Sequence, residues 1–313
     1  MAMGVFMVRP LKVGVQLPEV EYAYTWPQLA EMAIVAEQVG LDSIWLGDHL
    51  MYRYQRQERE PRGPFEAWTT LGALAAITTR VELGPLVASI GFHSPVMIAK
   101  KAATIDQISG GRFILGLGSG WHEPEYRGFG FPFDHRVSRF EESFTIIRAL
   151  LETGECDYAG EYYTIEGGLL FPKPARAGGI PLMLGSCGPR MLAAALPHVA
   201  MWNGWYEDWD NDLTGLARLL AEIDNACEKA GRDPGTLIRT ICPLVRMTGG
   251  RGRISDFPGQ SGDNPLDGTD PAALAEELRA YAELGVGHVQ FVIDPITASS
   301  IAELRAVLDL LDA

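Results

Sequence analysis

The chain has 313 residues, of which 47% are hydrophobic, so it is long and apolar enough for one large α/β domain or two ordinary ones. Its formal net charge of −14 argues against a basic face for nucleic acid and against attraction to an anionic membrane surface. No apolar run approaches the roughly 18 residues that a membrane span requires.

Cysteine usage and the N-terminal sequence both indicate a cytoplasmic location. The four cysteines lack C-x-x-C spacing, so we interpret them as reduced thiols rather than as a disulfide framework or a zinc site. The first residues, MAMGVFMVRPLK, contain an apolar patch but no basic region before it and no small-residue cleavage site. This pattern argues against a secretory signal peptide.

Strand-like and helix-like segments alternate along the chain. The strand-like KVGVQLP at 12–18 is followed by WPQLAEMAIVAEQVG at 26–40, whose apolar residues recur at helical spacing between an early proline and a final glycine. Further strands are predicted at 43–48, 81–90, 112–120, 180–186, 199–205, 236–247 and 288–294. Further helices are predicted at 65–79, 95–109, 138–153, from 189 onward, and at 213–230, 271–285 and 300–311.

Eight strand–helix units over this length predict a parallel (β/α)8 TIM barrel with insertion loops at its C-terminal face. We expect residues 1–313 to form a single barrel domain. An open doubly wound sheet fits less well, because it usually carries a glycine fingerprint after its first strand, where this chain has QLPEVEY.

Three segments are longer than ordinary loops. Residues 121–136 follow the fourth strand and residues 248–270 follow the seventh, so both are expected on the C-terminal, catalytic face of the barrel. Residues 248–270 are rich in Gly, Asp and Pro and are our candidate for a lid, the alternative being a tolerated surface insertion. Residues 154–179 alternate like a β-hairpin.

The run GRFILGLGSGWHEPEYRGFG at 111–130 combines glycines with aromatic, histidine and acidic side chains. It is not the dinucleotide fingerprint G-x-G-x-x-G, because Trp121 stands where the third glycine is needed, and it lacks the lysine of a phosphate loop. HEPE at 122–125 is not the zinc motif H-E-x-x-H, and its proline would break the helix that such a site requires. We therefore expect no metal site.

Catalytic groups of a barrel gather where its strands end. Asp48 and His49, after the second strand, form the best candidate pair, because histidine titrates near neutrality and can exchange a proton beside a reacting ring. The alternative is that Asp48 caps the next segment and His49 packs. Aromatic and amide groups at the other strand ends indicate a pocket for a flat conjugated ligand and an apolar substrate, to which we assign Gln16, Trp121, His122, Trp202 and Trp205.

GSCGPRML at 185–192 has the pattern of a strand end, a glycine turn and a helix that begins with proline. Free backbone N–H groups, the helix dipole and Arg190 would together hold a phosphate monoester. The alternative is an ordinary turn in which Arg190 pairs with a surface acid.

Several of these segments resemble one known family. QLP at 16–18, SIWLGDH at 43–49 and the long run from RVELGPLVASIGFHSP to SRFEE at 80–142 resemble the bacterial-luciferase-like flavin-dependent oxidoreductases. The resemblance is closest to the branch that uses the 5-deazaflavin coenzyme F-420. GEYYTIEG, IPLMLGSCGPRML and MWNGW continue it, so that it covers roughly residues 12–245 in order.

The resemblance implies a flavin or deazaflavin ring at the C-terminal mouth of the barrel. His49 matches the family's histidine near the hydride-carrying carbon, and Asp48 matches the acid that contacts the ring. A non-prolyl cis peptide would map to Leu86–Val87 and support the ring from behind. The remaining cofactor contacts map to Ser89 near the ring, to Ser119 and Gly120 along the cofactor chain, and to Gly185, Ser186, Cys187, Gly188, Arg190 and Met191 at the phosphate turn.

The resemblance also offers a reason for the glycines of the fourth strand. Gly116, Gly118 and Gly120 would let that strand pass close to the ring and its side chain. The alternative is that they only relieve packing inside a crowded barrel. Two departures from the family pattern argue against a sugar-phosphate substrate: Trp121 stands where sugar-phosphate dehydrogenases carry an acid, and Arg53 lies nearest to the position of their tryptophan.

The expected function is hydride transfer between noncovalently bound coenzyme F-420 and a small, apolar organic substrate. One alternative is an FMN-dependent monooxygenase that uses O₂ and reduced flavin from a separate reductase. Another is a noncatalytic cofactor-binding protein. The second helix, with Leu71, Leu74, Ala75 and Ile77, offers an apolar patch for a homodimer, the alternative being ordinary packing on the barrel.

Overall fold

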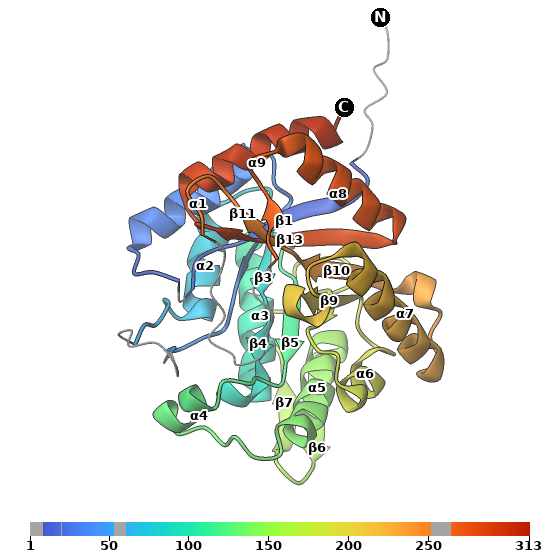
Figure 1. The fold of residues 1–313 in the computed structure, drawn as a ribbon. Coiled ribbons are helices and arrows are strands. Elements are labelled where there is room, and N and C mark those ends of the chain that lie inside the picture. The colour runs from blue at the N-terminus through green and yellow to red at the C-terminus, as the bar shows by residue number, and fades with distance from the viewer. Residues whose placement is uncertain (1–8, 20, 53–60, 252–263) are drawn as a thin grey trace, which may run out of the picture.

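The computed structural model describes residues 9–19, 21–52, 61–251 and 264–313. Its parallel strands follow one another in the neighbour order β3, β2, β1, β13, β10, β9, β8, β5, β4. A parallel bridge between Leu83 and Phe113 joins the third strand to the fourth, so the sheet is a nearly closed barrel (Figure 1). This arrangement confirms the predicted (β/α)8 fold.

The barrel has eight strand positions, two of which are split. The third consists of β3 and β4 and the seventh of β10 and β11, with Pro243 at the second break. The bounds are β1 (Lys12–Gln16), β2 (Ser43–Leu46), β3 (Glu82–Pro85), β4 (Ala88–Ser89), β5 (Leu115–Gly118), β8 (Leu182–Leu184), β9 (Met201–Trp205), β10 (Ile238–Cys242), β11 (Leu244–Arg246) and β13 (Val286–Asp294).

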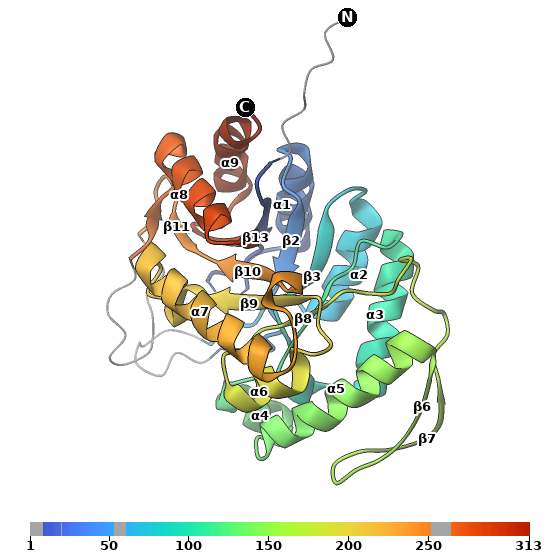
Figure 2. The same cartoon turned by 90° about the vertical axis from the view of Figure 1, so that its right-hand side faces the viewer.

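Helices surround the barrel (Figures 1 and 2). They are α1 (Trp26–Gln38), α2 (Ala67–Ile77), α3 (Pro95–Ser109), α4 (Glu123–Phe129), α5 (Arg136–Thr153), α6 (Pro189–Ala195), α7 (Leu213–Lys229), α8 (Pro271–Glu283) and α9 (Ala298–Leu311). Within the described ranges, no helix has the length and apolar character needed to cross a bilayer.

Local sequence signals explain where these helices begin and end. Asp212, Asp270 and Thr297 cap α7, α8 and α9 by accepting hydrogen bonds from first-turn N–H groups. Helices α3 and α5 end at Gly110 and Gly154, both in the left-handed conformation that glycine adopts without a Cβ penalty.

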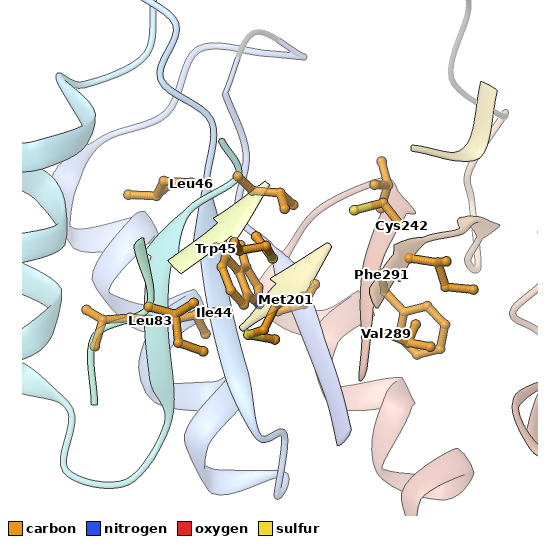
Figure 3. Packing of buried hydrophobic residues seen from close by; sticks show 14 of the residues in the cluster. Ile44, Trp45, Leu46, Leu83, Met201, Cys242, Val289 and Phe291 are labelled. Carbon is orange, nitrogen blue, oxygen red and sulfur yellow. The ribbon is translucent and has the colours of Figure 1, made fainter. Parts of the chain in front are cut away.

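The Trp45 side chain of β2 packs against the two neighbouring strands, β1 and β3. Ideal Cβ atoms on Gly14 and Gly84 would lie 3.1–3.2 Å from its indole, so the glycines of the neighbouring strands make room for it. Figure 3 shows Ile44, Trp45 and Leu46 along β2 within the core. Because successive residues of a strand face opposite sides, Ile44 and Leu46 face away from Trp45.

The three long segments differ in position. Residues 121–136 follow β5 and contain α4, as expected for the C-terminal face. Residues 154–179 contain the predicted hairpin, β6 (Glu155–Ala159) paired with β7 (Thr164–Leu169), but it follows the end of α5 and packs beside α3 and α5 (Figure 2). It is therefore not an insertion of the catalytic face, because a helix returns the chain to the opposite end of the barrel.

The candidate lid is described only at its ends. Residues 252–263 lie outside the described residues, and β12 (Leu266–Asp267) pairs in parallel with β11. Most of the apolar patch proposed for a homodimer is buried by contacts within the chain. Leu71, Leu74 and Ala75 are buried in the core, which supports ordinary packing of α2 on the barrel.

Candidate active site

His49 lies just beyond β2, between two buried carboxylates. Its Nδ1 is 3.0 Å from Oε2 of Glu125, and its Nε2 is 4.0 Å from Oε2 of Glu19. Glu125 comes from α4 and Glu19 from the segment after β1. Three segments that follow different strands therefore meet at the His49 imidazole. The carboxylates are only 1% and 4% exposed, whereas the imidazole is 20% exposed.

Glu125 is held from both of its oxygens. Its Oε1 accepts hydrogen bonds from the backbone N–H groups of Leu50 and Met51, at 2.6 and 3.1 Å. Its Oε2 faces the His49 ring. The carboxylate therefore joins α4 to the loop after β2 and fixes the orientation of the histidine.

The electrostatic surroundings raise the pKa of His49. Burial alone lowers the pKa of an imidazole, because it penalises the charged form. Here the hydrogen bond with Glu125 and the charges of Glu19, Glu125 and Asp48 outweigh that desolvation. The site therefore favours the protonated imidazole over a wider pH range than water does.

Asp48 has one oxygen engaged and one unpartnered. Its Oδ2 accepts the backbone N–H of Ser89 at 3.0 Å and lies 2.9 Å from Nε2 of His93. Its Oδ1 is buried and has no hydrogen-bond partner among the residues that the structure describes. Buried acceptors are rarely left unpaired, so this oxygen is a candidate contact for a ligand.

Ser89 belongs to a second group, built around Tyr126. The Tyr126 hydroxyl lies 2.8 Å from Oγ of Ser89 and donates to the carbonyl oxygen of Ser119 at 3.0 Å. Gly120 lies against both hydroxyls, where a Cβ would overlap them, and its φ is +75°. Gly120 is thus required by the protein's own packing.

The Leu86–Val87 peptide bond is cis, as the resemblance implies. The half-buried Val87 side chain rests against three backbone positions that lack a Cβ. Ideal Cβ atoms on Gly116, Gly118 and Gly185 would each lie 2.8 Å from a Val87 methyl group. Val87 and Tyr126 fill the space beside Gly116, Gly118 and Gly120, which supports the alternative that these glycines relieve packing inside the barrel. That the strand also passes close to a cofactor stays a prediction.

The turn at 185–192 forms as predicted, with Gly188 as the N-cap of α6 and Ser186 Oγ accepting the Gly188 N–H at 3.1 Å. Met191 is buried. Burial and nearby Asp208 raise the pKa of the Cys187 thiol to about 12, so this cysteine is held protonated. Arg190 is 61% exposed and pairs with Glu141 at 2.6 Å, the surface-acid partner that the sequence left open.

The aromatic residues after β5 gather beside His49. Trp121, 49% exposed, meets the His49 ring edge-on with centroids 5.8 Å apart. His122 is buried and stacks on Tyr52 with centroids 4.5 Å apart. Gln16 donates to the Glu19 carboxylate, and its own Oε1 has no hydrogen-bond partner within the described part of the chain.

The two tryptophans of β9 lie on opposite faces of the strand. Trp202 is fully buried, lies beside Leu219 of α7 and donates to the carbonyl oxygen of Ser186 at 2.9 Å. It therefore packs in the helix layer, and its assignment to a substrate pocket is wrong. Trp205, three residues further along the strand, is partly exposed, and its ring tilts against that of Tyr206 with centroids 5.1 Å apart.

Sequence reasoning missed Glu19, Glu125, Tyr126 and His93. Glu125 belongs to the HEPE segment that lacks the zinc-motif spacing, and it falls on the first turn of a helix beside the end of the fourth strand. Glu19 directly follows the QLP motif. Their position close to strand ends was the available signal, but no spacing rule links them to His49.

The luciferase-like monooxygenase family matches residues 1–247 of the sequence. The chain belongs to this family. A pyrimidine monooxygenase, RutA, from Cronobacter sakazakii is 32% identical over 178 residues, which cover 55% of this chain and 51% of RutA. The chain thus spans about half the length of this curated relative.

Solved structures show the same luciferase-like fold over nearly the whole chain. An F-420-dependent secondary alcohol dehydrogenase in complex with an F-420–acetone adduct has a TM-score of 0.78 at 19% identity, covering 96% of this chain and 99% of that one. A riboflavin lyase, RcaE, with modified FMN and riboflavin has a TM-score of 0.78 at 15% identity, covering 96% and 91%.

Proposed function

We propose that this luciferase-like protein is an oxidoreductase that binds coenzyme F-420 noncovalently and transfers hydride between it and a small, apolar organic substrate in the cytoplasm. The observation that carries the proposal is the end of β2, where unpartnered Oδ1 of Asp48 and the bracketed imidazole of His49 lie close together. A buried acceptor beside a partly exposed imidazole fits the polar edge of a planar ring.

The chain's own residues divide the work of holding the cofactor. Val87, supported by backbone without Cβ atoms, offers an apolar surface to the ring, and Asp48 and Ser89 offer polar contacts to its edge. Ser119 and Gly120 would follow the cofactor chain, and the turn at 185–192 would hold its phosphate. When bound, the deazaflavin would supply or accept the hydride, and His49 would hold or move a proton at Nε2.

The substrate side is assigned to Gln16, Trp121, His122 and Trp205. Trp121 meets the His49 ring, so a substrate in contact with His49 would also contact an indole face or edge. Aromatic side chains favour apolar or conjugated molecules over sugar phosphates.

A second candidate is an FMN-dependent monooxygenase, which the similarity to a pyrimidine monooxygenase supports. In that case a separate reductase would supply reduced FMN, O₂ would be the oxidant and the substrate would be a pyrimidine-like ring. The same Asp48, Val87 and phosphate-turn contacts would serve either ring.

The test is a titration of the protein with F-420 and with FMN, followed by tryptophan quenching, in the wild type and in Arg190→Ala. Arg305→Ala is the matched control, because Arg305 is similarly exposed and also pairs with a single surface acid. The proposal expects F-420 to bind more tightly than FMN and to weaken about tenfold in Arg190→Ala only, the size of a charge-assisted phosphate contact.

Each other outcome leads to a different conclusion. Tighter binding of FMN supports the monooxygenase. Binding of F-420 that Arg190→Ala leaves unchanged removes Arg190 from the phosphate site. Binding of neither cofactor overturns the assignment. Tight binding would favour a noncatalytic binding protein if alcohols do not reduce the oxidised deazaflavin, ketones do not oxidise the reduced one, and reduced FMN with O₂ does not oxygenate pyrimidines.

A further inference from the structure

We propose that Glu125 is a positioning residue, whose carboxylate keeps a proton on Nδ1 of His49, so that Nε2 is the nitrogen that exchanges a proton in the site. The proposal deepens the function proposed above and rests on it for the meaning of that exchange. The geometry on which it depends belongs to the chain itself.

The first step of the argument is the acceptor character of Glu125. Two backbone N–H groups, from Leu50 and Met51, already donate to its Oε1. Such donors stabilise the ionised form of a carboxylate. An ionised carboxylate can only accept, so its Oε2, 3.0 Å from Nδ1 of His49, requires a hydrogen on that nitrogen.

The second step concerns Nε2. With the hydrogen on Nδ1, a neutral His49 has its lone pair on Nε2, on the side where Glu19 lies 4.0 Å away. Glu19 is held in place by Gln16 and by close contact with the backbone of Gly47, where any Cβ would overlap its carboxylate. Nε2 therefore faces an acid that can stabilise the imidazolium without replacing the Nδ1 contact.

The proton balance is simple. A proton moves from a donor in the site to Nε2, giving an imidazolium whose charge is offset by Glu125 and Glu19. The reverse step returns the proton from Nε2 and leaves the Nδ1–H contact intact. No atom of Glu125 changes its bonds, which is why we call it a positioning residue.

Three ionisable groups act on His49 from different elements. Glu125 on α4, Glu19 after β1 and Asp48 at the end of β2 favour its charge. The neighbouring His122, the N-cap of α4, has a pKa that burial and the charge of His49 lower, against the opposing effect of Glu125. Removing the charge of Glu125 should therefore shift the titration of His49 more than removing any exposed acid.

The experiment is long-range ¹H–¹⁵N NMR of the histidine rings in the full, ligand-free chain, with His49 assigned by comparison with His49→Asn. The wild type is expected to show the Nδ1–H tautomer when neutral. Glu125→Gln should lower the pKa of His49 by roughly one unit or more, the effect of a close opposite charge. Glu123→Gln is the matched control, since Glu123 lies on the same helix but pairs with exposed Arg127.

An Nε2–H tautomer in the wild type would overturn the proposal, and so would an unchanged titration in Glu125→Gln. If Glu125→Gln fails to fold, as judged by circular dichroism, the wild-type tautomer still decides the question. Because the measurement needs no cofactor, a failed titration with F-420 and FMN would reject the proposed function without touching this result.

Discussion

A histidine lies near each end of β2, and the two have different neighbours. At the C-terminal end, His49 lies between Glu19 and Glu125. At the N-terminal end, His288 of β13 lies 2.7 Å from Oγ of Ser43, which also accepts the indole N–H of Trp45 at 2.7 Å. Because that hydroxyl accepts from Trp45, its own hydrogen is free to be donated to Nε2 of His288.

The surroundings set opposite pKa shifts at the two ends. Burial, helped by the charge of Lys12, lowers the pKa of His288 to about 3, and among the described residues no acid offsets these two effects. At His49 the same burial is outweighed by carboxylates, so the pKa is raised. Burial alone thus favours a neutral histidine, whereas buried acids beside the ring favour the protonated form.

The largest expected effect on stability comes from substituting Gly120, which lies at the same end of the barrel as His49. In Gly120→Ala the new methyl group would overlap the hydroxyls of Tyr126 and Ser89 at a positive φ. We expect a loss of about 3 kcal/mol in the free energy of unfolding, from overpacking and backbone strain together.

Gly130→Ala is the control for this change, measured by urea denaturation alongside it. Gly130 has the same φ of +75° but no atom within 4 Å of its Cβ position. It should lose only about 1 kcal/mol, the backbone component. Equal losses in the two variants would show that the contact between Gly120 and Tyr126 contributes nothing.

The second prediction concerns His288 and the dependence of stability on pH. The pKa of His288 is about 3 in the folded chain against a reference of 6.5, so the unfolded chain binds more protons between these values. Stability from this group is complete above pH 6.5 and declines as the pH falls toward 3. Between pH 7 and pH 5 the loss should be about 2 kcal/mol.

His288→Asn should remove that acid dependence, as seen in urea denaturation at a series of pH values. His135→Asn is the control, because His135 is exposed and asparagine tolerates its positive φ. A slope that is the same in His288→Asn and wild type would mean that His288 does not titrate as described.

The smallest effect is expected at His49 and has the opposite sign. Its pKa is raised in the folded chain, so its contribution to stability is complete below the unfolded value and is lost as the pH rises through the folded one. His49→Asn should flatten the decline above neutral pH. The effect should be smaller than at His288, because the His49 ring keeps partial contact with solvent, and a steeper decline in the variant would contradict the assignment.

Much of the fold could be predicted because its signals are local. Alternating strand and helix patterns, caps such as Asp270 and the glycine stops at Gly110 and Gly154 each depend on a few neighbouring residues. The candidate pair Asp48–His49 was also visible, because barrel chemistry gathers where strands end. The cis bond at Leu86–Val87 followed from the family resemblance alone.

The sequence by itself determined the barrel, the end of the barrel where catalytic groups are expected, and the candidate histidine. The reason is that strand and helix patterns, and the order in which they alternate, depend on residues close together in the chain. Only the tertiary structure decided that Glu19 and Glu125 bracket that histidine, that Gly116 and Gly118 face Val87, and that Trp202 lies in the helix layer. These outcomes depend on which side chains meet across barrel closure, and such contacts join residues far apart in the chain.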